Sequence, residues 1–373
     1  MSQTQPNDPE TLEKLRSRFV RHESHYDVSR WHLVLHPSVV KECARNALPG
    51  PLGRVMHPTN ATLAADDGRR HNWKSRSHRK GRYRNTSSPD HPSIWRKVGN
   101  MITHIEYWNV SWWVSVGFTL GSIVWVVNGF AAFLPFCNSH FTKADHSTGW
   151  TAFLGATIFE IASIFGIWEA WNRNDAATFG SNVKQALSPS KSRGSEKRPI
   201  TKKNNNSSES QPHPSEENGQ RWIWFSADPK FFYEVGFLAG FFQLLAASIF
   251  WISGFTAIPT IQSAIEENQG LTDGIFWTPQ VIGGSGFAIS AIFIMLEAQD
   301  VWWKPKPTSL GWHVGFWNGV GAVGFTLCGA FGYASTVNTG MAYQSSLSTF
   351  WGGWAFLIAS VIQWYECVNP KED

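Results

Sequence analysis

Residues Pro307–Tyr365 read PTSLGWHVGFWNGVGAVGFTLCGAFGYASTVNTGMAYQSSLSTFWGGWAFLIASVIQWY and contain no Asp, Glu, Lys or Arg. A bilayer core is about 30 Å thick, and a helix crosses it with roughly 20 apolar residues. This segment is therefore long enough for two membrane helices and a turn. Three more stretches lack charged residues, namely Tyr107–Thr142, Val235–Ile265 and Gly274–Leu296. The pattern predicts an all-α polytopic membrane protein.

The overall composition hides this pattern. The chain has 373 residues and a formal net charge of +4, and its mean hydropathy of −0.23 would suggest a soluble protein. The average misleads because the charges lie almost entirely outside the apolar stretches. The 21 Trp residues point the same way, since Trp favours the membrane–water interface. A soluble enzyme with a single core is excluded on these grounds.

Motifs of soluble enzymes are missing from the sequence. The four cysteines have neither CxxC nor His/Cys metal spacing, so we expect no disulfide framework and no zinc site. Residues 319–324 match GxGxxG, but they lie inside an apolar segment rather than between a strand and a helix. There is also no HExxH motif and no P-loop. We therefore expect no cofactor, and an enzyme is the least favoured class.

The apolar stretches and the segments between them predict the domain organisation. Residues 1–106 form a basic N-terminal region that we expect to be largely flexible, and residues 173–229, rich in Ser, Asn, Lys and Pro, should be a disordered linker. The remaining segments, 107–172, 230–302 and 303–373, would each form a two-helix hairpin. The six helices are expected at 108–134, 149–172, 231–257, 278–300, 310–334 and 346–368.

The basic residues predict how the chain is oriented. Residues 1–106 hold 18 of the 32 Lys and Arg residues and residues 173–230 hold 10, whereas the three loops of the opposite side hold only Lys143. Basic residues accumulate on the cytoplasmic side of membrane proteins. We therefore expect an integral multi-pass protein with both termini in the cytoplasm. The sequence does not indicate which membrane it occupies or its oligomeric state.

The second helix of each predicted hairpin aligns on a glutamate. GATIFEIASIFGIWEAWN contains Glu169, GGSGFAISAIFIMLEAQD contains Glu297, and GGWAFLIASVIQWYECVN contains Glu366. Glycines, phenylalanines and isoleucines coincide in the same alignment. The chain is therefore predicted to consist of three copies of one hairpin, which cannot bury their faces alone and pack against one another. Small residues at helix crossings, such as Gly283 and Gly284, would allow close approach in lipid.

This hairpin resembles the YrhK-like family of two-helix membrane proteins. The resemblance lies in an apolar helix ending in Ser-Ile-Phe-Trp-x-x-Gly-Phe (248–255), a short outer loop, and Gly-Gly-x-x-Phe-x-Ile in the next helix (283–289). Fungal multi-pass integral membrane proteins of similar length show the same pattern. The resemblance covers 107–369, implies a repeated hairpin architecture and supplies no activity.

Glu160 is the first candidate for a functional site. It lies ten residues after Trp150, which at about 1.5 Å per residue places it near mid-bilayer. A carboxyl group at that depth usually faces a cavity or a partner, and Gln243 is expected at a similar depth. One interpretation is a proton or cation site formed by the two residues. The alternative is a neutral glutamate that joins two helices by hydrogen bonds.

A belt of polar residues at the cytoplasmic ends of the helices is the second candidate. If the predicted repeats bring its carboxylates together, they would form an acidic ring that attracts cations. Alternatively, these residues lie at the interface, reaching water or pairing with nearby Lys and Arg. The belt comprises Asn109, Glu169, Glu234, Glu297, His313 and Glu366.

The basic tract at 69–84 suggests a partner. A basic segment on the cytoplasmic side, ahead of a membrane helix, commonly contacts anionic lipid, so we expect anionic lipid contact or a solvated tail here rather than nucleic-acid binding.

The sequence leaves the biochemical function open between two classes. One is a transporter or channel for a small solute or cation, using Glu160 and the acidic belt; it predicts a hydrated cavity in the bundle. The other is a non-enzymatic membrane scaffold or sensor that acts through its cytoplasmic segments.

Overall fold

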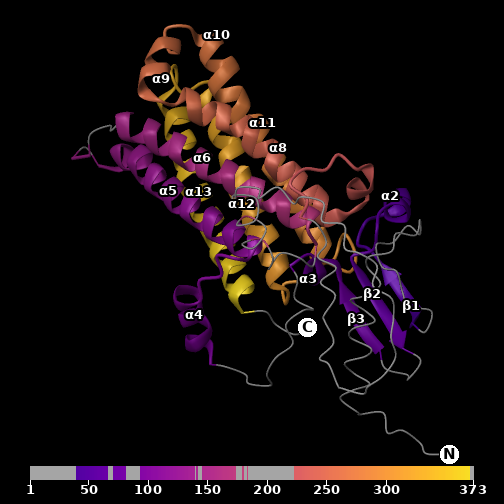
Figure 1. Cartoon of the computed structure of the whole chain (residues 1–373). Coiled ribbons are helices and arrows are strands. Elements are labelled where there is room, and N and C mark those ends of the chain that lie inside the picture. Colours follow the sequence, from indigo (N-terminus) through magenta and orange to yellow (C-terminus); the bar gives the residue numbers. More distant parts are fainter. Residues whose placement is uncertain are drawn as a thin grey trace, which may run out of the picture.

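The computed structural model describes residues 39–65, 70–80, 93–138, 140–141, 145–173, 179, 183 and 222–369. Within this part the chain is mostly helical, with one small β-sheet. Six helices are long and apolar enough to cross a membrane, as predicted, and Figure 1 shows them as one bundle. They are α5 (Val110–Cys137), α6 (Asp145–Trp171), α8 (Val235–Thr256), α11 (Thr278–Ala298), α12 (Leu310–Gly332) and α13 (Thr339–Val368).

Two of the six spans begin at least seven residues earlier than the sequence predicts. The fourth continues upstream of α11 through α10 (Gln269–Thr272) and a π-turn, η5 (Asp273–Trp277). The sixth begins at Thr339, where the side chain of Asn338 accepts hydrogen bonds from two backbone N–H groups of the first turn. The two extensions mix polar and apolar residues, so a count of consecutive apolar residues misses them. The Asn338 cap satisfies exposed backbone donors at the start of the sixth span.

The six helices close into a ring. Each packs against the next in the order α5, α6, α8, α11, α12, α13, and α13 packs back against α5. Every predicted hairpin therefore consists of two neighbouring helices. We call the end where α5, α8 and α12 begin, and α6, α11 and α13 end, the network end. The short helices α9 (Pro259–Ile265) and α10 lie at the opposite end (Figure 1).

Aromatic side chains fill the centre of the ring. Each helix contributes one large ring to a single buried cluster, with small alanines between them. Ring centroids lie 4.8 Å apart for Trp125 and Phe325 and 5.1 Å apart for Phe325 and Phe356. Pairs of this geometry are favourable beyond their burial alone. The six aromatic residues are Trp125, Phe159, Phe250, Phe287, Phe325 and Phe356.

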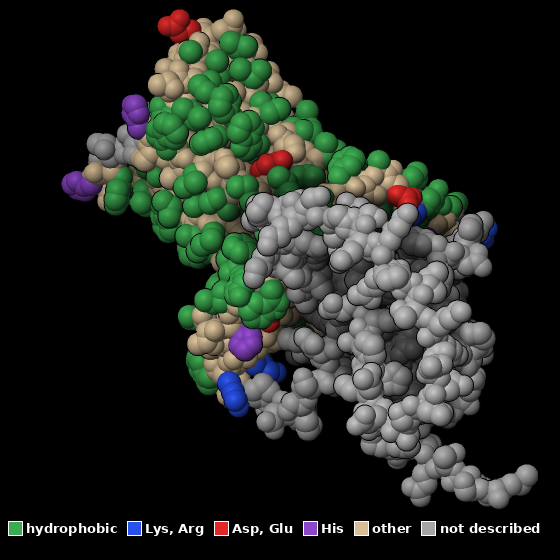
Figure 2. Space-filling view, viewed as in Figure 1, with side chains coloured by type: hydrophobic (Ala, Val, Ile, Leu, Met, Phe, Trp, Pro, Cys, Tyr) green, Lys and Arg blue, Asp and Glu red, His purple; other side chains and the backbone are tan. Residues whose placement is uncertain are grey.

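Glycines permit the close helix crossings. A Cβ atom on Gly284 of α11 would lie 2.6 Å from Oγ1 of Thr326 and 2.8 Å from its backbone nitrogen, and one on Gly324 of α12 would lie 2.8 Å from Cα of Gly352. In lipid, where apolar burial gives little drive for helix association, such backbone proximity is a main source of stability. The visible face of the bundle is largely covered by hydrophobic side chains (Figure 2).

Part of the N-terminal region is folded, which differs from the expected flexibility of 1–106. Strands β1 (Val39–Arg45), β2 (Asn60–Ala65) and β3 (Arg70–Lys74) form an antiparallel sheet in that order, and Ala61 pairs with Trp73. The strands have only five to seven residues. Because they contain no long apolar stretch, the sequence pattern does not reveal them. Most of the predicted linker, and the segments 1–38 and 81–92, lie outside the described residues.

The N-terminal region also contains three short helices. Helix α2 (Gly50–Val55) lies between β1 and β2, α3 (Ser75–Arg79) follows β3 directly, and α4 (Ile94–Thr103) precedes α5. The backbone N–H of His57 donates to the carbonyl oxygen of Tyr233 over 2.7 Å, so the sheet region is attached to the network end of the bundle.

Candidate functional site

Three glutamates converge at the network end of the ring. Glu169, Glu297 and Glu366 lie near the C-terminal ends of α6, α11 and α13, which are alternate helices of the ring. Their exposed fractions are only 1%, 3% and 5%. A buried carboxylate without a partner is costly, so each needs a cation or hydrogen-bond donors. The three side chains that the sequence alignment matches therefore do meet, and they meet away from water.

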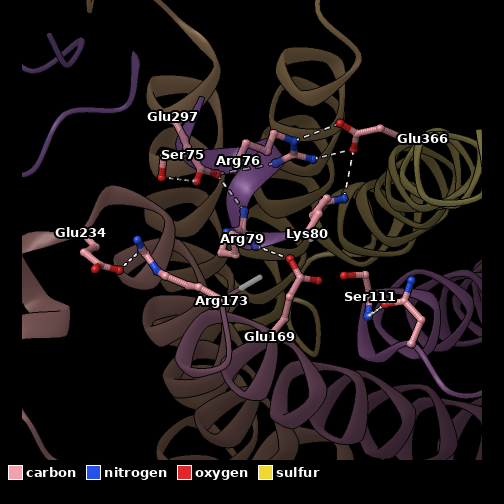
Figure 3. A network of polar contacts seen from close by, with 11 residues as sticks. Ser75, Arg76, Arg79, Lys80, Ser111, Glu169, Arg173, Glu234, Glu297 and Glu366 are labelled. Atoms are coloured by element: carbon pink, nitrogen blue, oxygen red, sulfur yellow. Dashed lines mark hydrogen bonds and ion pairs between the residues drawn. The ribbon is translucent and has the colours of Figure 1, made fainter. Parts of the chain in front are cut away.

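Helix α3 and Lys80, the residue that follows it, supply the cations. Arg76 binds Glu366 through two hydrogen bonds, from Nε to Oε1 at 3.1 Å and from Nη2 to Oε2 at 2.8 Å. The Nζ atom of Lys80 donates to the same Oε2 over 3.1 Å. Arg76 also lies 3.7 Å, from Nη1 to Oε2, from Glu297. The two-point contact is the strong form of an arginine–carboxylate pair, and Figure 3 shows these side chains directed into the ring of carboxylates.

Arg79 connects the other two carboxylates. Its Nη1 atom lies 2.5 Å from Oε1 of Glu169, and its Nη2 atom lies 2.7 Å from Oε2 of Glu297. The hydroxyl of Ser75 donates to Oε1 of Glu297 over 3.3 Å. Glu297 therefore receives charge from both arginines and a hydroxyl as well. We call Ser75, Arg76, Arg79, Lys80, Glu169, Glu297 and Glu366 the charge network.

The local sequence explains why α3 reaches this position. The backbone N–H of Ser75 donates to the carbonyl oxygen of Thr59 over 2.8 Å, which fixes the turn from β3 into α3. Arg76, Arg79 and Lys80 are three and four residues apart, a spacing that places them on one side of a helical turn. All three cationic groups are thus directed at carboxylates.

Two glycines leave room for the arginines. A Cβ atom on Gly236 of α8 would lie 2.4 Å from Oε1 of Glu297 and 2.9 Å from Nε of Arg79. One on Gly311 of α12 would lie 2.6 Å from Nε of Arg76. Helices α8 and α12, which carry no network glutamate, therefore contribute space rather than charge.

The network is electrically balanced and keeps its arginines charged. Three carboxylates face two guanidinium groups and one ammonium group. Burial alone would lower the pKa of Arg76, but the Glu366 carboxylate, with help from Glu297, raises it above its ordinary value. For Arg79 burial is likewise outweighed, and Glu297 and Glu169 raise its pKa. The arrangement is therefore a set of buried ion pairs.

A second, smaller cluster lies beside the network. Glu234, the residue before α8, pairs with Arg173, and Nδ1 of His57 lies 3.8 Å from its Oε1. Burial, and then the positive charge of Arg173, lower the pKa of His57 to about 4. Glu234 is thus in the belt as predicted, but it serves the junction between the sheet region and the bundle rather than the ring of carboxylates.

The other two members of the belt have local roles. Asn109 caps α5 by accepting from the backbone N–H of Ser111 over 3.0 Å, and it donates to Glu106. Nε2 of His313 lies 2.7 Å from the carbonyl oxygen of Pro307. Of the six predicted belt residues, the charge network therefore contains the three aligned glutamates only.

Glu160 lies away from the ring centre. Its Oε1 accepts a hydrogen bond from the hydroxyl of Ser248 over 2.9 Å, at the seam between α6 and α8. The carboxyl group is half-buried. Its partner lies on α8, as Gln243 does, but it is the hydroxyl of Ser248 and not the amide of Gln243. Phe159, its neighbour in sequence, takes the inward position, which is why Glu160 cannot also point to the axis.

Sequence reasoning missed the cationic half of the site. Ser75, Arg76, Arg79 and Lys80 are part of a tract that was expected to contact lipid or water. Their partners lie 90 to 290 positions further along the chain. The one usable signal was the coincidence of three aligned helix-end carboxylates with a basic run of helical spacing.

A search for metal-binding side chains and three comparisons with known proteins bear on function. Among the described residues, no three His, Cys, Asp or Glu side chains are placed to hold a metal ion. The chain matches no family model, no curated protein and no solved structure. The resemblance to YrhK-like hairpins and the threefold repeat therefore remain predictions.

Proposed function

We propose that the protein is a non-enzymatic membrane scaffold whose helical ring holds its own N-terminal sheet region at the membrane face. The charge network supports this proposal most directly. Helix α3 lies in the end of the ring, where its two arginines and the following Lys80 all contact carboxylates. Such a fit is expected of a docking site, since removing either set of charges would leave the other buried and unpaired.

The centre of the ring favours a scaffold over a transporter. A solute path along the axis would have to pass six interlocked aromatic side chains. Beyond them, the acidic ring that would attract a cation is already neutralised by α3. Glu160 lies at the α6–α8 seam instead of on the axis. We therefore do not propose transport, and we assign Glu160 the role of a hydrogen-bonded link between two helices.

The predicted repeat forms part of the proposal. The aligned glutamates take equivalent places at the network end, and the aligned residues Phe159, Phe287 and Phe356 take equivalent places in the aromatic cluster. Three copies of one hairpin would account for both coincidences. We also place the network end, and with it both termini, in the cytoplasm, since the basic residues of the chain gather there.

Charge reversal of Arg79 tests the docking role. In the full-length protein in lipid nanodiscs, Arg79→Glu should abolish the hydrogen-exchange protection of β2 and β3 while the six spans stay protected. Arg54→Glu, the same change on an exposed residue of α2, is the matched control and should leave protection unchanged. If Arg79→Glu left the strands as protected as in the parent protein, the docking proposal would be wrong.

A flux measurement tests the alternative class. Vesicles containing the parent protein should pass monovalent cations and protons no faster than protein-free vesicles. A flux that appears with the parent protein and disappears with Glu160→Gln would favour transport and contradict the scaffold proposal.

A further inference from the structure

Helix α4 carries an apolar face that the described chain does not cover. Its ten residues read IWRKVGNMIT. On a helical wheel Ile94, Trp95, Val98, Met101 and Ile102 fall within one arc, and Arg96, Lys97, Asn100 and Thr103 fall on the other side. The apolar side chains are largely exposed, with values of 66% for Ile94, 82% for Trp95 and 77% for Ile102. A face of this kind in water would be unfavourable, so it calls for an apolar partner.

The attachments of α4 fix its level relative to the membrane. Nδ2 of Asn369 donates to the carbonyl oxygen of Lys97 over 2.9 Å, and Nδ2 of Asn100 donates to Oδ1 of Asn369 over 3.2 Å. Asn369 follows the last residue of the sixth span. At its other end, α4 stops at Thr103 and α5 begins at Val110, which leaves only a short connection. Both attachments are therefore at the boundary of membrane-spanning helices.

The polar side of α4 makes these attachments, so its apolar arc is turned away from the bundle. The residues that follow continue the exposed apolar surface, with Ile105, Tyr107 and Trp108 leading into α5. Aromatic residues at this level are typical of the membrane–water interface.

We propose that α4 is an interfacial helix that inserts its apolar arc into the lipid monolayer at the network end and binds anionic headgroups with Arg96 and Lys97. A short helix with an apolar face, a basic polar face and an exposed Trp is the composition that lies in the interface plane. Basic residues at this level attract anionic lipid. The inference does not depend on the scaffold proposal, because the residues of α4 do not belong to the charge network.

A lipid surface fits this face better than a second copy of the chain. A standard protein interface buries roughly 800 Å² on each partner, which is large for one face of a ten-residue helix. The apolar surface also continues through the exposed side chains of Ile105, Tyr107 and Trp108 up to α5. This continuity favours a monolayer, because lipid can cover such a surface along its whole length.

Photocrosslinking in vesicles of phosphatidylcholine and phosphatidylglycerol tests the proposal. In the full-length protein, benzoylphenylalanine replaces Ile102 in the apolar arc, or Thr103 on the opposite side as the matched control. Both positions are exposed, so neither change should disturb folding. We expect lipid adducts, detected by the mass of the labelled peptide, to be several times more abundant at position 102 than at 103.

The other outcomes each overturn the proposal. A crosslinked dimer at 102 would identify a second copy as the occupant, and a crosslink within one chain would identify one of its own segments. Equal lipid yields at 102 and 103, or only water-quenched product, would show that α4 does not lie in the monolayer.

The headgroup preference is tested separately. Replacing both basic residues, Arg96→Gln with Lys97→Gln, should lower the share of phosphatidylglycerol among the lipid adducts at 102 by up to about five-fold per residue. Arg54→Gln in α2 is the control and should leave that share unchanged. If the double variant kept the parent share, the anionic headgroup would be contradicted even if lipid contact remained.

Discussion

Glu297 shows at the residue scale why the charge network holds the sheet region in place. Its carboxylate accepts from Ser75 and Arg79 and lies within 3.7 Å of Arg76. Buried ion pairs often add little compared with an apolar replacement, but removing one partner leaves the others uncompensated. The network therefore provides specificity: α3 fits this ring end, and a segment without matched cations would not.

Glu297→Gln is the sharpest single change in the network. It keeps the size of the side chain but removes the charge shared by the two arginines, so we expect thermal unfolding of the full-length protein to show a loss of about 3 kcal/mol or more. Asp300→Asn is the matched control, because Asp300 pairs with Lys306 over 3.0 Å at the surface, where the side chains are 50% and 31% exposed. That control should change stability by less than about 1 kcal/mol. Equal effects of the two variants would contradict the network as described.

His57 predicts how the junction responds to pH. Burial and the Arg173 guanidinium lower its pKa from 6.5 to about 4, and the Glu234 carboxylate, which would favour protonation, is itself paired with Arg173. The unfolded chain thus binds a proton here below about pH 6.5, whereas the folded chain stays neutral down to about pH 4. Stability from this group is complete above pH 6.5 and falls as the pH drops towards 4.

Hydrogen exchange of β2 at pH 7 and pH 5 measures this effect. The parent protein should lose protection at pH 5 relative to pH 7, and His57→Gln, which has no titrating group at this position, should lose less. Parallel losses in the two proteins would assign the pH dependence to other residues.

At the scale of elements, the membrane helices were predictable and the elements that dock on them were not. The six spans follow from charge-free stretches such as Val235–Ile265, because the bilayer requires a helix of a given length. Strand β3 and helix α3 lie in a basic segment with no apolar run, and they form against partners far along the chain. A pattern read within a short window contains no information about such contacts.

The candidate site was predicted in part for the same reason. Glu169, Glu297 and Glu366 could be brought together by aligning helix ends, since equivalent positions in packed hairpins lie at equivalent depths. Glu234 and His313 lie at the same depth but at the start of the first helix of a hairpin. Their side chains point away from the three network glutamates. Glu160 was expected near mid-bilayer, facing either a cavity or a partner. It bonds to Ser248 at the seam between α6 and α8, while the neighbouring Phe159 takes the inward position.

The close approach of α3 to α8 and α12 depends on glycines of these two helices. Gly311→Ala places a methyl group 2.6 Å from Nε of Arg76, and Gly236→Ala places one 2.4 Å from Oε1 of Glu297. The contacted atoms are held in ion pairs and cannot move without breaking them. We expect each variant to lose about 1–3 kcal/mol in thermal unfolding. Gly166→Ala in α6, where the added carbon meets nothing within 4 Å, should be neutral or stabilising by up to about 1 kcal/mol.

At the scale of the whole molecule, the ring separates the protein into two ends of different chemistry. The network end holds the sheet, α3, α4 and the ends of three helices with their glutamates, whereas the opposite end holds α9 and α10, which carry no Lys or Arg. The aromatic cluster lies between them. Such a division fits a platform that works on one side of the membrane, and it makes orientation a decisive property.

We predict that the network end faces the cytoplasm, because the predicted topology assigns 31 of the 32 basic residues to that side. Cys137 is exposed and ends α5 at the opposite end. In sealed vesicles with the cytoplasmic face outward, an impermeant maleimide should label Cys137 only after detergent is added, in a chain whose other three cysteines are replaced by serine. Arg54→Cys, exposed at the network end, should be labelled at once in the same background with Cys137 also replaced.

The reverse labelling pattern would show that the protein has the opposite orientation in the membrane. The charge network and α4 would then act on the other face, and the basic residues would have to be explained by their ion pairs rather than by insertion.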